Sequence, residues 1–287
     1  MNKKKIYSSW FLLPAMLIFI VFFIVPMVMS LFFSMTVWDL KTWTWCGFDN
    51  YKTFFAERSM SIGIKNTMIY AAFTSGIKVV LAFFIALFLT SNIKTNNLLS
   101  SIVFFPNLVS TIAVGITFTA LMHPRKGLIN TALEVIGING PNWLGNPDLA
   151  LWSVILVDVW KGVGIATVIY IAGIQSIDKT YFEAASIDGA TKWQSIKNVM
   201  LPLCRPAMNS VIILSFIGGL RSFDMIWAMT GGGPGFATDV IASVIYKQYA
   251  SGFYGLSTAG NVILFILIAL FAFPLQNFLN KLEKEVS

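Results

Sequence analysis

Six long apolar stretches, separated by shorter polar segments, dominate the hydrophobic pattern of this chain. They fall at about residues 10–37, 66–90, 99–122, 150–173, 206–228 and 257–281. Each is close to or above the ~20 residues that an α-helix needs to cross the hydrocarbon core of a bilayer. The pattern therefore predicts an all-α integral membrane protein with six transmembrane helices, organised as one membrane domain over residues 1–287.

The first apolar stretch follows three consecutive lysines, as the hydrophobic part of a secretory signal peptide would. It is much longer than the ~7–15 apolar residues of such a signal, and no small-x-small cleavage site follows it. We therefore expect the stretch to stay in the protein as the first membrane span.

The polar segment 178–202, between the fourth and fifth stretches, has the local signals of ordered structure; we call it the elbow. Asp178 is suited to cap the start of a short helix. Gly189 then supplies a break where a positive φ is needed. Thr191 and Gln194 have the spacing of a capping box that opens a second helix. That helix is expected to carry Trp193, Ile196 and Met200 on one face.

Composition and charge fit this picture. The 287 residues are 56% hydrophobic and only 11% charged, whereas a soluble domain has about 25% charged residues. The net charge of +7 is scattered among the spans, which suits loops facing anionic lipid rather than nucleic acid. With one histidine and two cysteines, the chain offers no Cys/His cluster for a metal, and we expect neither a metal site nor a cofactor.

The basic residues also predict the orientation. Of the 20 lysines and arginines, three lie within predicted spans, ten lie on the same side as the N-terminus and seven lie on the other side. Because cytoplasmic loops carry the excess of lysine and arginine, we expect both termini and the elbow in the cytoplasm.

Five ionisable residues fall inside predicted spans, where charges are costly and usually face a cavity or a partner. They are Lys78, Asp158, Lys161, Arg221 and Asp224. Asp158/Lys161 and Arg221/Asp224 are spaced i, i+3, so each pair is predicted to neutralise itself on one helix face. We take these four residues, with Trp160 as a stacking surface for a sugar ring, as a candidate solute path. The alternative is that the pairs hold spans together.

No residue pattern predicts catalysis. The chain has no Gly-x4-Gly-Lys-Ser/Thr phosphate loop, and Lys161-Gly162 has the reverse order. Any ATP-derived energy must therefore come from another subunit.

The elbow resembles the EAA loop of ABC-importer permeases, the binding-protein-dependent transport family. The matching residues are Glu183, Ala184, Ala185, Gly189, Leu201 and Pro202. Val199 stands where isoleucine is usual, and Asp178 replaces the usual proline ahead of the first helix. The resemblance implies that the elbow is a cytoplasmic coupling loop that receives movement from ATPase subunits.

Other segments resemble the sugar and oligosaccharide branch of that family. They are Ile171-Ala-Gly173-Ile-Gln175 ahead of the elbow, then Phe223-Asp224, Thr230-Gly-Gly-Gly-Pro234 and Thr238. The resemblance implies a type I ABC-importer permease fold in the cell membrane. It also implies three partners, namely a homologous permease subunit forming a heterodimer, ABC ATPase subunits on the cytoplasmic face and an extracytoplasmic solute-binding protein.

Two alternatives stay open at this point. One is an ABC permease for glycerol phosphate or another polar solute, which shares every motif above. The other is an ion-coupled secondary transporter that works alone, against which the elbow and the lack of two pseudo-symmetric halves both argue. The sequence does not name the solute.

Overall fold

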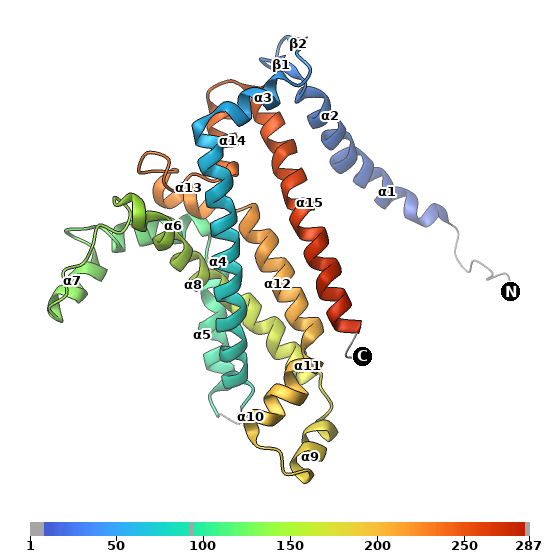
Figure 1. The fold of residues 1–287 in the computed structure, drawn as a ribbon, viewed down its shortest axis with the longest axis vertical. Helices are drawn as coiled ribbons and strands as arrows, with labels where there is room; N and C mark the ends of the chain where they lie inside the picture. The colour runs from blue at the N-terminus through green and yellow to red at the C-terminus, as the bar shows by residue number, and fades with distance from the viewer. Residues whose placement is uncertain (1–8, 92–93, 285–287) are drawn as a thin grey trace. The chain divides into compact units, whose positions relative to one another are not determined.

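The computed structural model describes residues 9–91 and 94–284 (Figure 1). Within them the chain is mostly helical, and its two strands form one short hairpin. The chain divides into two compact units. Unit 1 contains Met1–Arg58 and Ile245–Phe265, and unit 2 contains Ser59–Val244 and Ile266–Ser287. Each unit is described by itself.

Unit 1 carries the first apolar stretch and the hairpin. Its elements are η1 (Ser9–Leu12), α1 (Leu13–Phe19), the π-helical turn η2 (Ile20–Ile24), α2 (Val25–Phe33), β1 (Thr36–Trp38), β2 (Trp43–Trp45) and α3 (Asp49–Ala56), with most of α14 (Ile241–Ala250) and the first part of α15 (Tyr254–Lys284). The strands are antiparallel, with Val37 opposite Thr44. The first span was predicted to reach residue 37, and this is wrong: the helix ends at Phe33, because residues 36–38 pair as β1.

Unit 2 is a helical assembly that contains the elbow. Its elements are α4 (Arg58–Leu89), α5 (Asn96–Leu108), α6 (Thr111–Leu121), α7 (Leu128–Val135), α8 (Pro147–Gln175), α9 (Lys179–Ile187), α10 (Lys192–Ser195), the π-helical turn η3 (Ile196–Met200), α11 (Leu201–Leu203), α12 (Arg205–Leu220) and α13 (Asp224–Thr230), with the start of α14 and the end of α15. Within this unit α8 packs against α5 and α12, and α6 packs against α13.

Two apolar clusters form the core of unit 2, and both include α4 and α8. The first surrounds Tyr70, Val154 and Ile226 and also takes in α6 and α13. The second surrounds Tyr170 and Val211 and also takes in α12. Buried polar bonds add to this packing: the side-chain amide of Asn66 donates to the carbonyls of Ala237 and Asp239, both at 2.9 Å. The two long helices α4 and α8 are therefore the frame on which the shorter helices are placed.

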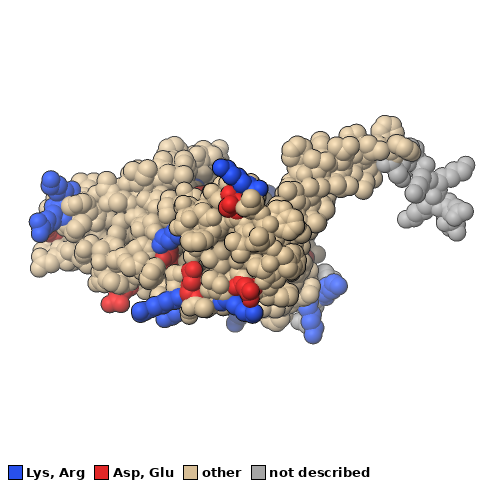
Figure 2. All heavy atoms as spheres, turned by 90° about the horizontal axis from the view of Figure 1, so that it is seen from above, with Lys and Arg blue, Asp and Glu red and all other residues tan. Residues whose placement is uncertain are grey.

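The helices account for the predicted membrane character. Among the described residues, four helices are long and apolar enough to cross a membrane: Trp10–Phe33, Arg58–Leu89, Pro147–Gln175 and Tyr254–Lys284. The number rises to six if each of two bent pairs is one span, the pairs being α5 with α6 and Lys192–Leu203 with α12. Large apolar side chains are exposed along these helices, and Figure 2 shows the charged residues in small separate groups on a surface that is otherwise neither acidic nor basic.

Two predicted spans are not single straight helices. The stretch 99–122 is divided into α5 and α6, which meet at 95° because Val109 and Ser110 take extended backbone angles. The stretch 206–228 is divided after Leu220, where α12 ends, and resumes as α13 at Asp224. With 16 residues, α12 is only about 24 Å long at ~1.5 Å per residue. In addition, α4 begins at Arg58, well before the predicted start at residue 66.

Candidate functional site

The elbow consists of two short capped helices, as the sequence predicts. The side chain of Asp178 accepts a hydrogen bond from the backbone N–H of Thr180 at 3.0 Å and so caps α9. At the second helix, the Gln194 N–H donates to Thr191 Oγ1 and the Thr191 N–H donates to Gln194 Oε1, which completes the capping box. The helix starts are thus held by side chains next to them in the sequence, and the elbow is an ordered element.

The turn between the two helices depends on Gly189. Its φ is +75°, in the left-handed region that glycine enters without steric cost. At the other end of α9, the hydrogen bond from Thr180 keeps the pKa of the Asp178 carboxyl below its ordinary value of 3.8. Asp178 is therefore a charged acceptor at neutral pH, which also suits the positive end of the α9 dipole.

The residues that match the EAA pattern occupy two different environments. Glu183 and Ala184 lie exposed on α9, Ala185 of the same helix is half-buried, and Gly189 is exposed in the turn. Leu201 and Pro202 lie half-buried in α11, at the joint between the elbow and α12. The elbow therefore has an exposed outer part and an inner part that meets the spans.

Apolar side chains are exposed on the outer part. Ile187 at the end of α9 is 87% exposed, and Tyr181 of the same helix is also exposed. Between the two elbow helices lies a hollow of 310 Å³ with Phe182, Ile196 and Met200 in its lining.

The face that carries Trp193, Ile196 and Met200 turns toward the spans. Trp193 and Ile196 line an apolar groove of 330 Å³ beside Phe83 of α4. Met200 packs against the second core cluster. This face therefore contacts the spans, while α9 carries the exposed side of the elbow.

A polar cavity lies within unit 2, between α4, α5, α6, α8 and α12. Its volume is 450 Å³, and its charged lining residues are Lys78, Asp158, Lys161 and Arg221. Asn107, Thr111 and Ser215 add neutral polar groups. The structure thus brings together three of the five predicted solute-path residues, with Lys78 in addition.

The other two predicted solute-path residues are not in the cavity lining. Trp160 is exposed and its ring packs against Phe118, with ring centroids 5.1 Å apart. Asp224 begins α13, beyond the break that follows α12. Neither contributes to the cavity.

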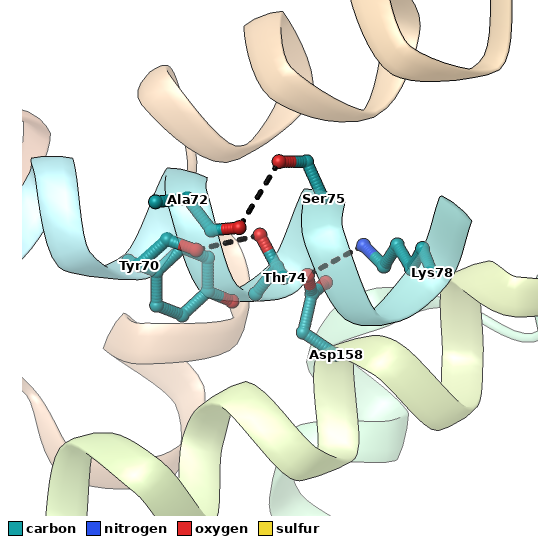
Figure 3. A network of polar contacts seen from close by, with 6 residues as sticks. All are labelled: Tyr70, Ala72, Thr74, Ser75, Lys78 and Asp158. Atoms are coloured by element: carbon teal, nitrogen blue, oxygen red, sulfur yellow. Dashed lines mark hydrogen bonds and ion pairs between the residues drawn. The ribbon is translucent and has the colours of Figure 1, made fainter. Parts of the chain in front are cut away.

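The ion pair in this cavity is not the predicted one. Lys78 Nζ lies 2.6 Å from Asp158 Oδ2, so Asp158 pairs with α4 rather than with Lys161 one turn along its own helix (Figure 3). Both side chains are largely buried, at 12% and 19% exposed. Gly162 of α8 makes room for this contact: a Cβ atom there would lie 2.7 Å from Lys78 Cε and 2.8 Å from Nζ.

The predicted Arg221/Asp224 pair is also absent among the described residues. The two residues do not share a helix, because α12 ends at Leu220, just before Arg221, and α13 begins at Asp224. The i, i+3 rule applies only within one continuous helix, so the break removes its basis.

The cavity therefore carries three cations and one carboxylate, a formal charge of 3 − 1 = +2. Within residues 9–91 and 94–284, Lys161 and Arg221 form no ion pair. Both are hydrogen-bond donors without acceptor capacity. The cavity can thus donate to hydroxyl, carboxylate or phosphate oxygens of a solute. Lys78 was visible in the sequence as an intramembrane cation, but no local spacing linked it to Asp158.

A helical membrane protein with a capped polar elbow and a polar cavity among its spans has the features of a transport permease. The family described as binding-protein-dependent transport system inner membrane component matches residues 78–284. The chain belongs to this family. It is a membrane-embedded permease subunit of an ABC transporter, without an ATPase site of its own, and the alternative of a secondary transporter is set aside.

Relatives of similar length support this assignment over nearly the whole chain. The trehalose/maltose transport system permease protein MalF of Thermococcus litoralis is 32% identical over 262 residues, covering 91% of this chain and 89% of the relative. The multiple sugar-binding transport system permease protein MsmF of Streptococcus mutans is 31% identical, covering 92% of each. The arabinooligosaccharides transport system permease protein AraP of Bacillus subtilis is 29% identical, covering 92% of this chain and 86% of the relative.

A solved structure shares the fold. One chain of a bacterial ABC transporter involved in the import of the acidic polysaccharide alginate superimposes with a TM-score of 0.79 at 25% identity, covering 96% of this chain and 94% of that chain. One chain of a bacterial alginate ABC transporter solved in complex with an alginate pentasaccharide-bound periplasmic protein superimposes with a TM-score of 0.80 at 25% identity.

Proposed function

We propose that this chain is a permease subunit of an ATP-driven importer for sugars or oligosaccharides, and that it forms a single membrane domain of six spans over residues 1–287. The names of its relatives, which transport maltose, trehalose and other sugars, support this substrate class. In this proposal the chain pairs with a homologous permease as a heterodimer, and a solute-binding protein delivers the solute from outside. The alginate transporter solved in complex with a saccharide-bound periplasmic protein supports the part played by the solute-binding protein.

The elbow, residues 178–202, is the docking surface for the ATPase subunits. The observation that carries this proposal is that two capped helices hold exposed apolar side chains, Tyr181 and Ile187, clear of the core. The excess of lysine and arginine on the same side supports a cytoplasmic elbow and cytoplasmic termini. Glu183, Ala184 and Gly189 lie exposed there and contact the ATPase, whereas Leu201 and Pro202 join the elbow to the spans.

Transport then follows alternating access. Closure of the ATPase dimer on ATP displaces the elbow, and the elbow reorients the spans around the cavity. The solute contacts the cavity through Lys161, Arg221 and the paired Asp158, while Asp224 and Trp160, which lie outside the lining, have no part in it. The elbow needs rigidity for this role, because a loose loop would absorb the displacement.

The test is substitution of Gly189. Proline cannot adopt the observed φ of +75°, so Gly189→Pro should abolish transport by the reconstituted importer while the permease still assembles in the membrane. Asparagine tolerates this region better than other non-glycine residues, so Gly189→Asn is the matched control and should retain most transport. Transport at the parental rate in Gly189→Pro would contradict the proposal.

A second candidate substrate class is favoured by the charge of the cavity. Among the described residues, Lys161 and Arg221 have no anionic partner. They therefore suit a solute that carries a carboxylate or phosphate, such as a uronic acid oligosaccharide or glycerol phosphate. Binding of neutral and acidic saccharides to the cognate solute-binding protein separates the two classes. Arg221→Gln should then impair transport of an acidic solute more than that of a neutral one.

A further inference from the structure

Three hydrogen bonds join the beginning of α12 to the end of α15, both within unit 2. Arg205 Nη1 donates to the Leu282 carbonyl at 2.7 Å. Asn209 Nδ2 donates to the Leu279 carbonyl at 3.3 Å and to Glu283 Oε2 at 2.8 Å. We infer that Arg205 and Asn209 are positioning residues for transport, which clamp the end of α15 to the beginning of α12, the helix that follows the elbow, so that the elbow and this end of α15 move together.

Arg205 stands at the point where the elbow becomes a span. It is the first residue of α12, directly after the bend of 68° that separates Lys192–Leu203 from α12. Its acceptor, the Leu282 carbonyl, lies in the last turn of α15 that the structure describes. The bond therefore joins the first residue of α12 to this part of α15.

Asn209 lies one helical turn after Arg205, on the same face of α12. It is only 6% exposed, so its amide must find partners inside the protein. Its bond to Glu283 has a charged acceptor, and such bonds are stronger than neutral ones. Two donors one turn apart therefore bond to two successive turns of α15. They fix the distance between α12 and α15 and the rotation of α15 about its own axis.

The end of α8 completes this clamp. A Cβ atom at Gly173 would overlap the Ala207 side chain and would lie 3.2 Å from Cys204 Sγ, so the absence of a side chain lets α8 and α12 touch. Cys204 and Leu279 are both buried. Since α8 leads into the elbow and α12 leads out of it, the two helices that flank the elbow meet beside the residues of α12 that bond to α15. Displacement of the elbow must then carry the end of the last span with it.

This inference rests on the proposed coupling role of the elbow. The experiment measures solute transported per ATP hydrolysed by the complete importer in proteoliposomes. Asn209→Ala should reduce this ratio by roughly fivefold, the effect expected for losing one or two buried hydrogen bonds, while ATP hydrolysis continues. Glu283→Gln keeps an acceptor oxygen for Asn209, so its ratio should stay near the parental value. If Asn209→Ala leaves the ratio unchanged, including the case in which transport and hydrolysis fall equally, the inference is overturned.

A covalent rescue tests the clamp without depending on that substitution. In a background of Cys46→Ser and Cys204→Ser, Asn209→Cys combined with Glu283→Cys, whose parental side chains are hydrogen-bonded, should lower the ratio, and a short bifunctional thiol reagent should restore it to that of the background. A cross-linked importer that hydrolyses ATP but does not transport would show that α12 and α15 have to separate, and would refute the clamp. If instead the parental importer shows no ATP-dependent transport, the proposed function itself fails, so the two failures are distinguishable.

Discussion

Removal of the Lys78 ammonium is the most direct test of the cavity described above. Lys78→Met keeps the length of the side chain but leaves the Asp158 carboxylate without its partner in a site where the two side chains are only 12% and 19% exposed. We expect this change to destabilise the permease far more than the same substitution at Lys161, which lines the same cavity and forms no ion pair among the described residues.

The magnitude follows from the geometry. Two unit charges at 2.6 Å attract by about 6 kcal/mol at an effective dielectric constant of ~20, and much of that offsets the cost of removing both from water. Removing one partner of a buried pair leaves that cost without its compensation and typically destabilises by about 3–5 kcal/mol. At ~2–4 °C per kcal/mol for chains of comparable size, Tm should fall by about 6–20 °C.

The assay is thermal unfolding of the assembled importer in detergent or nanodiscs, followed by loss of the folded complex. Lys78→Met, Asp158→Leu and the double variant form a double-mutant cycle. The double variant should be more stable than either single one, because no buried charge is then left unpaired. Gly162→Ala should lower Tm, as Lys78→Met does, since the added Cβ would displace Lys78 from Asp158.

Additive effects in the cycle, within ~0.5 kcal/mol, would refute the pairing of Lys78 with Asp158. A fall in Tm for Lys161→Met as large as that for Lys78→Met would also contradict it, because the loss would then come from any cation of the cavity rather than from this pair.

Two further predictions concern local bonds. Because the pKa of Asp178 is lowered in the folded protein, its helix cap is fully present above pH 3.8 and is lost as the pH falls through the lower folded pKa. Hydrogen exchange at the Thr180 amide, corrected for intrinsic rates, should therefore lose protection only below about pH 3.8. Asp178→Asn should remove this pH dependence. Asn66→Ala removes two buried hydrogen bonds and should destabilise by about 1–3 kcal/mol, whereas Asn277→Ala, on the exposed face of α15, should stay within ~0.5 kcal/mol; equal Tm values for these two variants would contradict the assigned bonds.

The sequence alone determined the features that depend on near neighbours. Asp178 caps the helix that follows it, and Thr191 and Gln194 form a capping box, because these bonds join residues two or three positions apart. The apolar stretches likewise indicate spans, since the cost of exposing polar backbone to lipid leaves little choice but a helix. Family membership followed from the same local pattern in the elbow.

Only the tertiary structure decided which distant residues meet. Asp158 pairs with Lys78, 80 positions away in the sequence, because α4 and α8 pack side by side and Gly162 leaves space for the lysine. The division of two predicted spans and the hydrogen bonds between α12 and α15 could likewise be found only in the tertiary structure. Spacing along a chain predicts which residues are neighbours within one helix. Which residue of another helix pairs with a buried carboxylate depends on how the helices pack, because that packing decides which cation lies within reach.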